Sequence, residues 1–188
     1  HFWLTTQETF LGFLIAAFVA ITLGTLVSQI RLVEKTVMPY VVAFQAVPKV
    51  ALAPLFLLWF GFGMTSKVVM SAVIGFFPIL INVIEGLRSA EVERLRMLTV
   101  FGASKWQLFV KVRLPSAMPF IFAGLDVGLL LALRGAVVGE FVGGGGLGLG
   151  SLILQTNYNF DIAGQIAVLI VLSTMGLLAH ALVRAAQR

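Results

Sequence analysis

The chain has 188 residues, of which 60% are hydrophobic and only 11% are charged, and its mean hydropathy is +1.04. A soluble domain carries about 25% charged residues, so this composition indicates a membrane protein and excludes an ordinary soluble domain. The chain has no cysteine, two histidines and a net charge of +5. These counts exclude disulfides, zinc–thiolate sites, cysteine nucleophiles and a histidine-rich metal site, and we expect no nucleic-acid partner.

Five stretches are apolar and long enough to cross a bilayer core as helices, which takes roughly 20 residues each. In chain order they are Phe10–Val27, Val37–Phe60, Val68–Ile84, Ala117–Val138 and Ile162–Val183. The second stretch contains Pro39, Pro48 and Pro54, so we expect a broken helix there. The predicted fold class is all-α integral membrane, with residues 1–188 forming one transmembrane domain. Because the sequence does not begin with Met, we expect one further span before His1, six in all.

The basic residues predict the orientation of these spans, because cytoplasmic loops carry an excess of Lys and Arg. With residues 88–115 in the cytoplasm, ten of the thirteen basic residues lie inside, Lys67 lies outside, and Lys49 and Arg134 lie within spans. The ten are Arg31, Lys35, Arg88, Arg94, Arg96, Lys105, Lys111, Arg113, Arg184 and Arg188. This orientation puts the C-terminus in the cytoplasm.

The segment 88–115 is a charged island between apolar spans. We expect one helix over Ala90–Phe101 that stops at Gly102, and a second over Lys105–Arg113 that Ser104 caps. Pro115 then allows the chain to enter the fourth span. The sequence therefore predicts a helix–turn–helix on the cytoplasmic face; the alternative is a basic loop lying against anionic lipid.

The loop between the fourth and fifth spans, Glu140–Asp161, holds six glycines among the eight residues 143–150. It is either a flexible connector or a tight turn followed by a short helix, and the apolar residues 152–154 favour the helix. It is not a phosphate-binding loop, because no Gly-Lys-Ser/Thr follows and no strand precedes it.

Several of these motifs resemble those of one protein family. Gly102 is followed by Ala103 and Ser104 and, after nine residues, by Val112-x-Leu114-Pro115, and this spacing resembles the EAA loop of ABC importer permeases. The likeness extends over Ala46–Gly63, Phe76–Leu87 and Val137–Leu154, which resemble segments of permeases for nitrate, sulfonates, taurine and thiamine-pyrimidine precursors. Where the family has Glu-Ala-Ala, this chain has Arg96, Met97 and Leu98, with Glu91 and Glu93 nearby but out of register.

The resemblance implies a type I ABC importer fold in the bacterial cytoplasmic membrane, in which residues 88–115 dock on an ATP-binding subunit dimer. It also implies an extracytoplasmic substrate-binding protein, a second permease subunit that we expect to be identical, and alternating access. The permease itself would be no enzyme and would hold no cofactor, since ATP and Mg²⁺ would bind the partner ATPase. The residues expected to couple to the ATPase are Glu91, Glu93, Arg94, Arg96, Gly102, Ala103, Ser104, Trp106, Leu114 and Pro115.

Polar residues within spans usually face a cavity or a partner. The candidates for a translocation path are Gln45, Lys49, Asn82, Asp126, Arg134 and Glu140. Arg134 either pairs with Glu140 or Asp161, or attracts an anionic substrate through its forked donors. For Lys49 we favour hydrogen bonds to carbonyl groups freed by Pro48. Glu85, near the inner end of the third span, is expected to pair with a loop arginine such as Arg88.

An ATP-independent secondary transporter or channel is the alternative function, because broken helices and charges in the membrane would suit it equally. The charged island argues against it, since a secondary transporter has no need of a docking segment. The sequence does not choose a substrate among nitrate, sulfonates, taurine, pyrimidines and riboflavin-like compounds.

Overall fold

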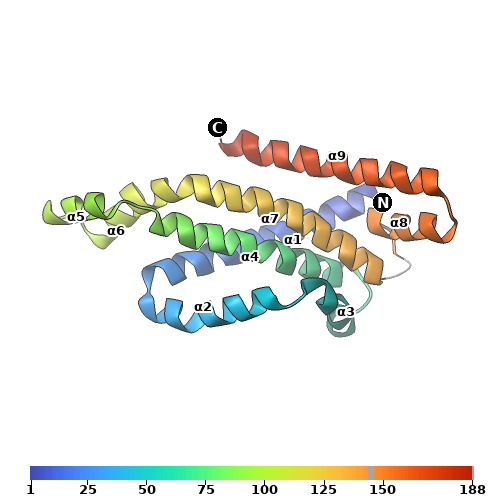
Figure 1. The fold of residues 1–188 in the computed structure, drawn as a ribbon, viewed down its shortest axis with the longest axis horizontal. Helices are drawn as coiled ribbons and strands as arrows, with labels where there is room; N and C mark the ends of the chain where they lie inside the picture. The colour runs from blue at the N-terminus through green and yellow to red at the C-terminus, as the bar shows by residue number, and fades with distance from the viewer. Residues whose placement is uncertain (144–145, 188) are drawn as a thin grey trace.

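The computed structural model describes residues 1–143 and 146–187, and every regular element in this part of the chain is helical (Figure 1). The elements in chain order are α1 (Phe2–Gln29), α2 (Arg31–Ala46), the 3₁₀ helix η1 (Lys49–Leu52), α3 (Ala53–Phe60), α4 (Met64–Arg88), α5 (Val92–Val100), α6 (Lys105–Leu108), the π-helical turn η2 (Phe109–Arg113), α7 (Leu114–Gly143), α8 (Leu149–Tyr158) and α9 (Ile162–Gln187). The predicted all-α class is confirmed.

Four segments of the described chain are long and apolar enough to cross a membrane: α1, α4, the continuous helix from Lys105 to Gly143, and α9. They contain the predicted first, third, fourth and fifth spans. The molecule is therefore a multi-pass membrane protein, with a fifth span if α2 and α3 are counted together.

The predicted second span, Val37–Phe60, is not one helix. It is split between α2 and the η1–α3 pair, whose axes are bent by 91°. The break lies at Val47 and Pro48, where Val47 is extended because a residue before proline is disfavoured in the helical region. Pro39 lies inside α2 without ending it, and Pro54 occupies the first turn of α3, where a missing N–H does no harm.

The core of the bundle is the contact between α4 and α7. Helices in lipid gain little from the hydrophobic effect when they associate, so small residues that allow close approach carry this contact. A Cβ on Gly135 would stand 2.8 Å from Ser71 Cα, and the Ser71 hydroxyl donates to the Ala132 carbonyl at 2.9 Å. Ile79 and Leu80 of α4 are fully buried beside this contact.

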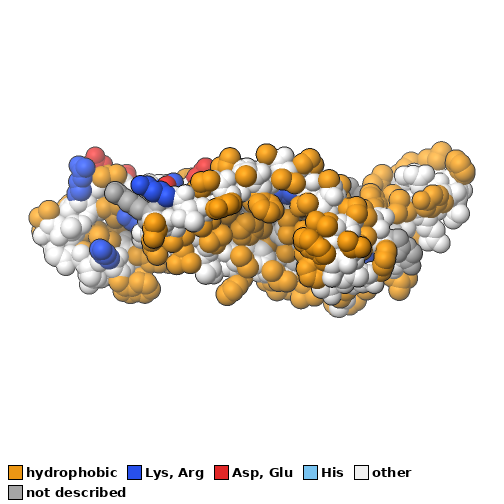
Figure 2. Space-filling view, turned by 90° about the horizontal axis from the view of Figure 1, so that it is seen from below, with side chains coloured by type: hydrophobic (Ala, Val, Ile, Leu, Met, Phe, Trp, Pro, Cys, Tyr) orange, Lys and Arg blue, Asp and Glu red, His pale blue; other side chains and the backbone are white. Residues whose placement is uncertain are grey.

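The two ends of the bundle differ. At one end, α5 and α6 project beyond the long helices; we call residues 88–115 the hairpin and this end the hairpin end (Figure 1). At the other end, which we call the distal end, lie α3, α8 and the N-terminus. In the face shown in Figure 2, hydrophobic side chains cover most of the molecule, whereas Lys, Arg, Asp and Glu gather mainly at the hairpin end. This distribution matches the asymmetry of charge predicted from the sequence.

The hairpin joins α7 without a break. The predicted helix Lys105–Arg113 is instead α6 followed by η2, in which the Leu114 N–H bonds the carbonyl of Phe109, five residues back. The wider turn lies just before Pro115, which has no N–H to continue the regular helical pattern. The result is one helical rod of 39 residues from Lys105 to Gly143.

The close approach of α4 and α7 generates a stability prediction. Replacing Gly135 by alanine would press a Cβ against backbone atoms of α4, so we expect a loss of about 1–3 kcal/mol. Gly176→Ala on α9 is the matched control, because its Cβ would meet its nearest neighbour at an ordinary 3.7 Å. Thermal unfolding in detergent should show a lower midpoint for Gly135→Ala and an unchanged or raised one for Gly176→Ala. Equal midpoints for the two variants would contradict this packing.

Candidate functional site

The turn of the hairpin is built as the sequence predicts. Gly102 has φ of +83°, a left-handed conformation that glycine adopts without strain and that ends α5. Ser104 begins α6 through a capping box, in which its side chain accepts from the Gln107 N–H and the Gln107 side chain accepts from the Ser104 N–H. The turn is therefore held by local hydrogen bonds.

The outer surface of the hairpin is apolar and uncovered. No residue of α5 or α6 is buried, and Val100, Phe101 and Trp106 are 85%, 79% and 72% exposed. Trp106 stacks on Phe109, with ring centroids 5.9 Å apart. Apolar side chains next to charged ones on a projecting segment are typical of a surface that another protein covers.

The charged residues expected to couple to an ATPase share this surface. Glu91 precedes α5 without capping it through its side chain, and Glu93, Arg94 and Arg96 are all exposed on α5. Ala103 is half-buried in the turn, and Leu114 and Pro115 form the first residues of α7. The ten predicted residues thus lie on one continuous segment.

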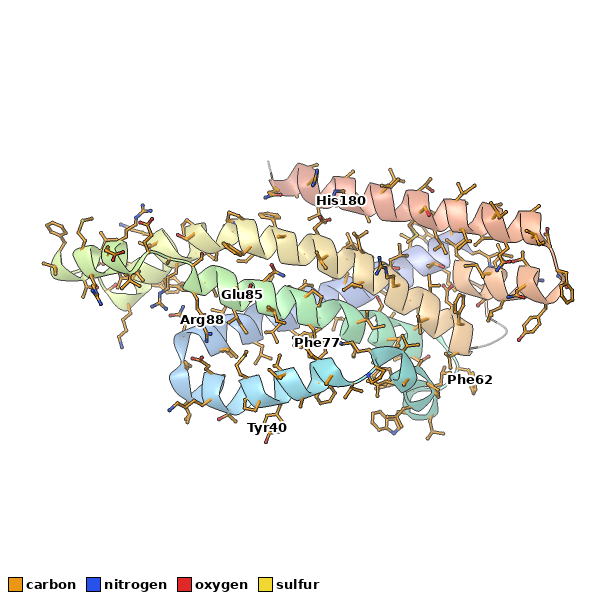
Figure 3. All side chains as sticks on the ribbon, in the orientation of Figure 1. Tyr40, Phe62, Phe77, Glu85, Arg88 and His180 are labelled. Atoms are coloured by element: carbon orange, nitrogen blue, oxygen red, sulfur yellow. The ribbon has the colours of Figure 1, made fainter. Side chains whose placement is uncertain are left out.

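Two contacts attach the base of the hairpin to the bundle. Arg88, at the end of α4, pairs with Glu34 of α2 at 2.8 Å, and Arg113 donates to the side-chain oxygen of Gln29 on α1 at 2.9 Å. Pairing of Arg88 with Glu85 was expected instead, and it is wrong: the Arg88 guanidinium contacts Glu34 on the neighbouring helix. Figure 3 labels Arg88 and Glu85 near the hairpin end of α4.

Among the described residues, no hydrogen bond or ion pair joins any two of the six candidates for a translocation path. Gln45 is exposed near the end of α2. Lys49 lies with its Nζ 4.9 Å from the ring centroid of Phe77, which faces α2 from α4 (Figure 3). This cation–π contact replaces the expected bonds to carbonyl groups, because the bend at Pro48 turns Lys49 toward the aromatic ring.

Asn82 and Asp126 have partners within the bundle. Asn82 donates to the Pro78 carbonyl at 2.9 Å. It also packs against Gly124, and it fills the space that a side chain at that position would need. Asp126 Oδ1 lies 2.6 Å from Nδ1 of His180 on α9 (Figure 3). His180 is therefore the kind of polar partner that a charged residue within a span, here Asp126, is expected to have.

Arg134 and Glu140 differ sharply in environment although both belong to α7. Arg134 is exposed, and it makes no ion pair among the described residues, whereas Glu140 is fully buried. The expected pairing of Arg134 with Glu140 or Asp161 is therefore not found. Glu140 accepts hydrogen bonds from the Thr5 hydroxyl, at 2.6 Å, and from the Gly150 N–H.

A cluster of buried polar groups at the distal end surrounds Glu140. It joins four helices: Thr5 and Glu8 of α1, Lys67 of α4, Glu140 of α7 and the first turn of α8. Lys67 Nζ lies 3.2 Å from Glu8 Oε1. Sequence reasoning singled out only Glu140. The sequence does hold one indication of the cluster: Glu8, Lys67 and Glu140 each lie within two residues of the distal edge of a predicted span.

The turn after Glu140 resolves the alternatives left open for the glycine-rich loop. A short helix, α8, follows the glycines, so the turn-and-helix interpretation is confirmed, with the helix beginning at Leu149. Gly144 and Gly145 lie outside the described residues, as does Arg188 at the C-terminus. A side chain at either Gly148 or Gly150 would collide with the Glu140 carboxylate, so both positions require glycine.

Two apolar grooves run along the bundle. One, of about 530 Å³, lies between α1, α2 and α4, and the other, of about 410 Å³, lies between α1, α7 and α9. Neither is lined by any of the six path candidates. A polar path across this single chain is therefore not formed by these grooves.

Residues 7–188 match a family model described as "Binding-protein-dependent transport system inner membrane component". The chain is 45% identical over 151 residues to the riboflavin transport system permease protein RibX of Chloroflexus aurantiacus, covering 80% of this chain and 55% of that protein. It is 39% identical over 170 residues to the formylaminopyrimidine transport permease protein ThiX of Halalkalibacterium halodurans, covering 88% and 67%. The chain thus spans about half the length of the first relative and two thirds of the second.

A solved structure has the same fold. The MetNI methionine ABC transporter in inward-facing conformations contains a chain that superposes with a TM-score of 0.82, covering 99% of this chain and 94% of that one. At 22% identity this likeness concerns the fold alone.

The Asp126–His180 contact generates a prediction for α9, which buries only Val168 and Met175. A double-mutant cycle with Asp126→Asn and His180→Gln should give a coupling energy of about 0.5–2 kcal/mol in unfolding free energy, the range for polar contacts between membrane helices. The measurement is the unfolding of the four proteins in detergent. Additive effects of the two substitutions would mean that the pair does not hold α9 to α7.

Proposed function

The chain belongs to the family of binding-protein-dependent transport system inner membrane components, and from this we propose that it is the permease subunit of an ATP-driven ABC importer. In this proposal it moves a small solute from an extracytoplasmic binding protein into the cytoplasm by alternating access. ATP and Mg²⁺ bind a separate pair of ATPase subunits, and the permease carries out no chemistry itself.

The hairpin is the observation that carries the proposal. Its apolar tip around Phe101 and Trp106 is uncovered, and its turn is preorganised by Gly102 and the Ser104 capping box. A partner can therefore bind it without first ordering it, which keeps the entropic cost of docking low. An ATP-independent carrier would have no use for such a surface.

The connections of the hairpin support a mechanical role. It follows directly from α4 and continues without a break into α7, the two helices with the closest packing in the bundle. A displacement of the hairpin by an ATPase would therefore move α4 and α7 together. On α5, Arg96 stands where the family has glutamate, so we propose that it meets an acidic group on the ATPase, with Glu91 and Glu93 as the acidic contacts.

The charge distribution supports the orientation. The hairpin end carries Arg88, Lys105 and Arg113, whereas the distal end carries Lys67, which is paired with Glu8. We therefore place the hairpin and the C-terminus in the cytoplasm and the distal end outside.

The dispersal of the path candidates supports a paired state. Gln45, Lys49 and Arg134 lie on different helices and line no common groove of one chain. We propose that two copies of the chain face each other and that the path runs between them. Exposed Arg134 would then supply a forked cationic donor to an anionic solute.

The substrate class follows from the relatives only in outline. Their printed names concern riboflavin, formylaminopyrimidine and, for a protein of Bacillus subtilis 31% identical over 188 residues, aliphatic sulfonates. Sulfonates are anions and the other two compounds are heterocycles, so we propose that the solute is a small anion or a heterocyclic compound such as a vitamin precursor.

The turn at Gly102 provides the test of coupling. A β-branched residue strongly disfavours a φ of +83°, so Gly102→Val should distort the hairpin and separate ATP hydrolysis from transport. In reconstituted vesicles we expect uptake to fall about tenfold or more, while hydrolysis no longer responds to the loaded binding protein. Gly102→Asn is the matched control, because asparagine tolerates the left-handed conformation.

Uptake by Gly102→Val equal to that of the wild type would reject the coupling role of the hairpin. ATP-independent uptake by the wild type would favour a secondary transporter instead.

Arg134 provides the test of the path. Arg134→Ala should lower uptake of an anionic solute about tenfold or more. Arg134→Lys should keep part of the uptake, because lysine retains the positive charge but lacks the paired N–H donors of the guanidinium group. Uptake is measured in vesicles with a panel of anions and with riboflavin as a nearly neutral comparison. An unchanged rate for every solute would remove Arg134 from the path.

A further inference from the structure

The buried cluster at the distal end holds more negative than positive charge. Glu8 and Glu140 are both fully buried, and Lys67, at 6% exposure, is the one cationic side chain in contact with either carboxyl group among the described residues. If both carboxyl groups were ionised, the cluster would carry a net charge of −1 away from water. Burial of an uncompensated charge is costly enough that such groups bind a proton or a counter-ion.

Glu140 is surrounded by hydrogen-bond donors. The Thr5 hydroxyl and the Gly150 N–H both donate to it, and the Leu149 N–H donates to Thr5 Oγ1 at 2.9 Å. The carboxyl group also faces the N-terminal turn of α8, whose free N–H groups favour an anion. Both carboxyl oxygens of Glu140 therefore accept hydrogen bonds.

Glu8 is in the opposite situation. Neither of its carboxyl oxygens accepts a hydrogen bond from the described residues, and its charged contact is the ion pair with Lys67. Glu8 lies one helical turn from Thr5, whose hydroxyl donates to Glu140, so both carboxyl groups belong to one buried cluster that holds Lys67. Two carboxyl groups that share a buried site repel each other when both are ionised, and the repulsion is relieved when one of them binds a proton.

We propose that Glu8 and Glu140 form a buried proton-binding site, in which one proton is shared between the two carboxyl groups. Bound there, the proton neutralises the cluster against Lys67 and supplies the donor that Glu8 lacks. It also joins α1, which carries Glu8, to the turn between α7 and α8, which Glu140 holds in place. Loss of the proton would leave two carboxylates in one buried cluster with a single lysine, and their repulsion would separate α1 from that turn. This inference rests on the geometry of the cluster and requires no transport cycle.

The other groups near the site limit alternative explanations. From α4 the cluster receives Lys67, and α8 contributes no charged side chain. The ring of His1 contacts the backbone of Gly148, with Nδ1 2.9 Å from its carbonyl oxygen and 3.0 Å from its nitrogen. Among the described residues, His1 is therefore the other titratable group in contact with this turn, and a variant must distinguish its effect from that of the two carboxyl groups.

The test measures exposure of the contact as a function of pH. The chain has no cysteine, so Leu149→Cys places a single thiol at a position that is 4% exposed beside Thr5. Its labelling by a soluble maleimide is measured on the full chain purified in detergent, as a ratio to labelling of Leu147→Cys, which is 64% exposed. The ratio corrects for the reactivity of thiols at each pH.

Because a proton stabilises the contact, protection must fall as pH rises. We expect the labelling ratio to increase about tenfold between about pH 6 and about pH 9. Glu8→Gln should stay protected throughout, because an amide donates a hydrogen bond to Glu140 without carrying a charge. Glu85→Gln, on an exposed part of α4, is the control and should behave as the wild type.

A labelling ratio that does not change with pH in the wild-type background would overturn the proposal, and that result does not depend on how any variant folds. The same pH response in Glu8→Gln, or its loss in His1→Gln, would also overturn it. Because no ATPase, binding protein or solute is present in this experiment, its outcome is independent of the outcome of the uptake experiments.

Discussion

The close contact between α4 and α7 is the constraint on which the rest of the structure depends. In lipid, water does not drive apolar helices together, so the pair is stabilised by backbone approach at small residues such as Gly135 and by the hydrogen bond from Ser71. Both regions to which we assign a role are attached to its ends. The hairpin connects α4 to α7 at one end, and at the other Lys67 of α4 and Glu140 of α7 enter the buried cluster.

In this proposal, the arrangement relates a surface that binds a partner to a contact that can open. Packed helices move as units, so a displacement applied at Gly102 is carried along α4 and α7 and is felt at the distal end. There, α1 and α8 meet the pair through polar groups, which can separate if they are hydrated or change protonation. Such an element with two arrangements is what alternating access requires.

Much of this could be predicted from the sequence, where the signal is local. The stop at Gly102, the cap at Ser104 and the helix after the glycine-rich turn depend on neighbouring residues, and all were found where expected. The bend after α2 was expected from its prolines, but only Pro48 produces it, because the other two occupy positions that tolerate proline.

The buried cluster could not be predicted, because it depends on contacts across more than a hundred residues. Glu8 and Glu140 lie 132 positions apart, and nothing near either residue in the sequence indicates the other. Partners were also misassigned when a group close in sequence was chosen over a distant one. Arg88 pairs with Glu34 and not with Glu85, and Lys49 lies over the ring of Phe77 and not against carbonyl groups near Pro48. In a helical membrane protein, polar partners are set by which helices pack together, and that packing depends on small residues whose contacts the pattern of hydrophobic residues does not reveal.

The central claim is that the tip of the hairpin docks on an ATPase. Site-specific cross-linking from Phe101, which is 79% exposed, tests it most directly in native membranes. A photoreactive group at this position should form a specific adduct with a subunit that carries nucleotide-binding motifs, and one at exposed Leu182 of α9 should form none. Adducts from Phe101 with lipid alone, or with a protein outside the membrane on the substrate-delivery side, would contradict the account.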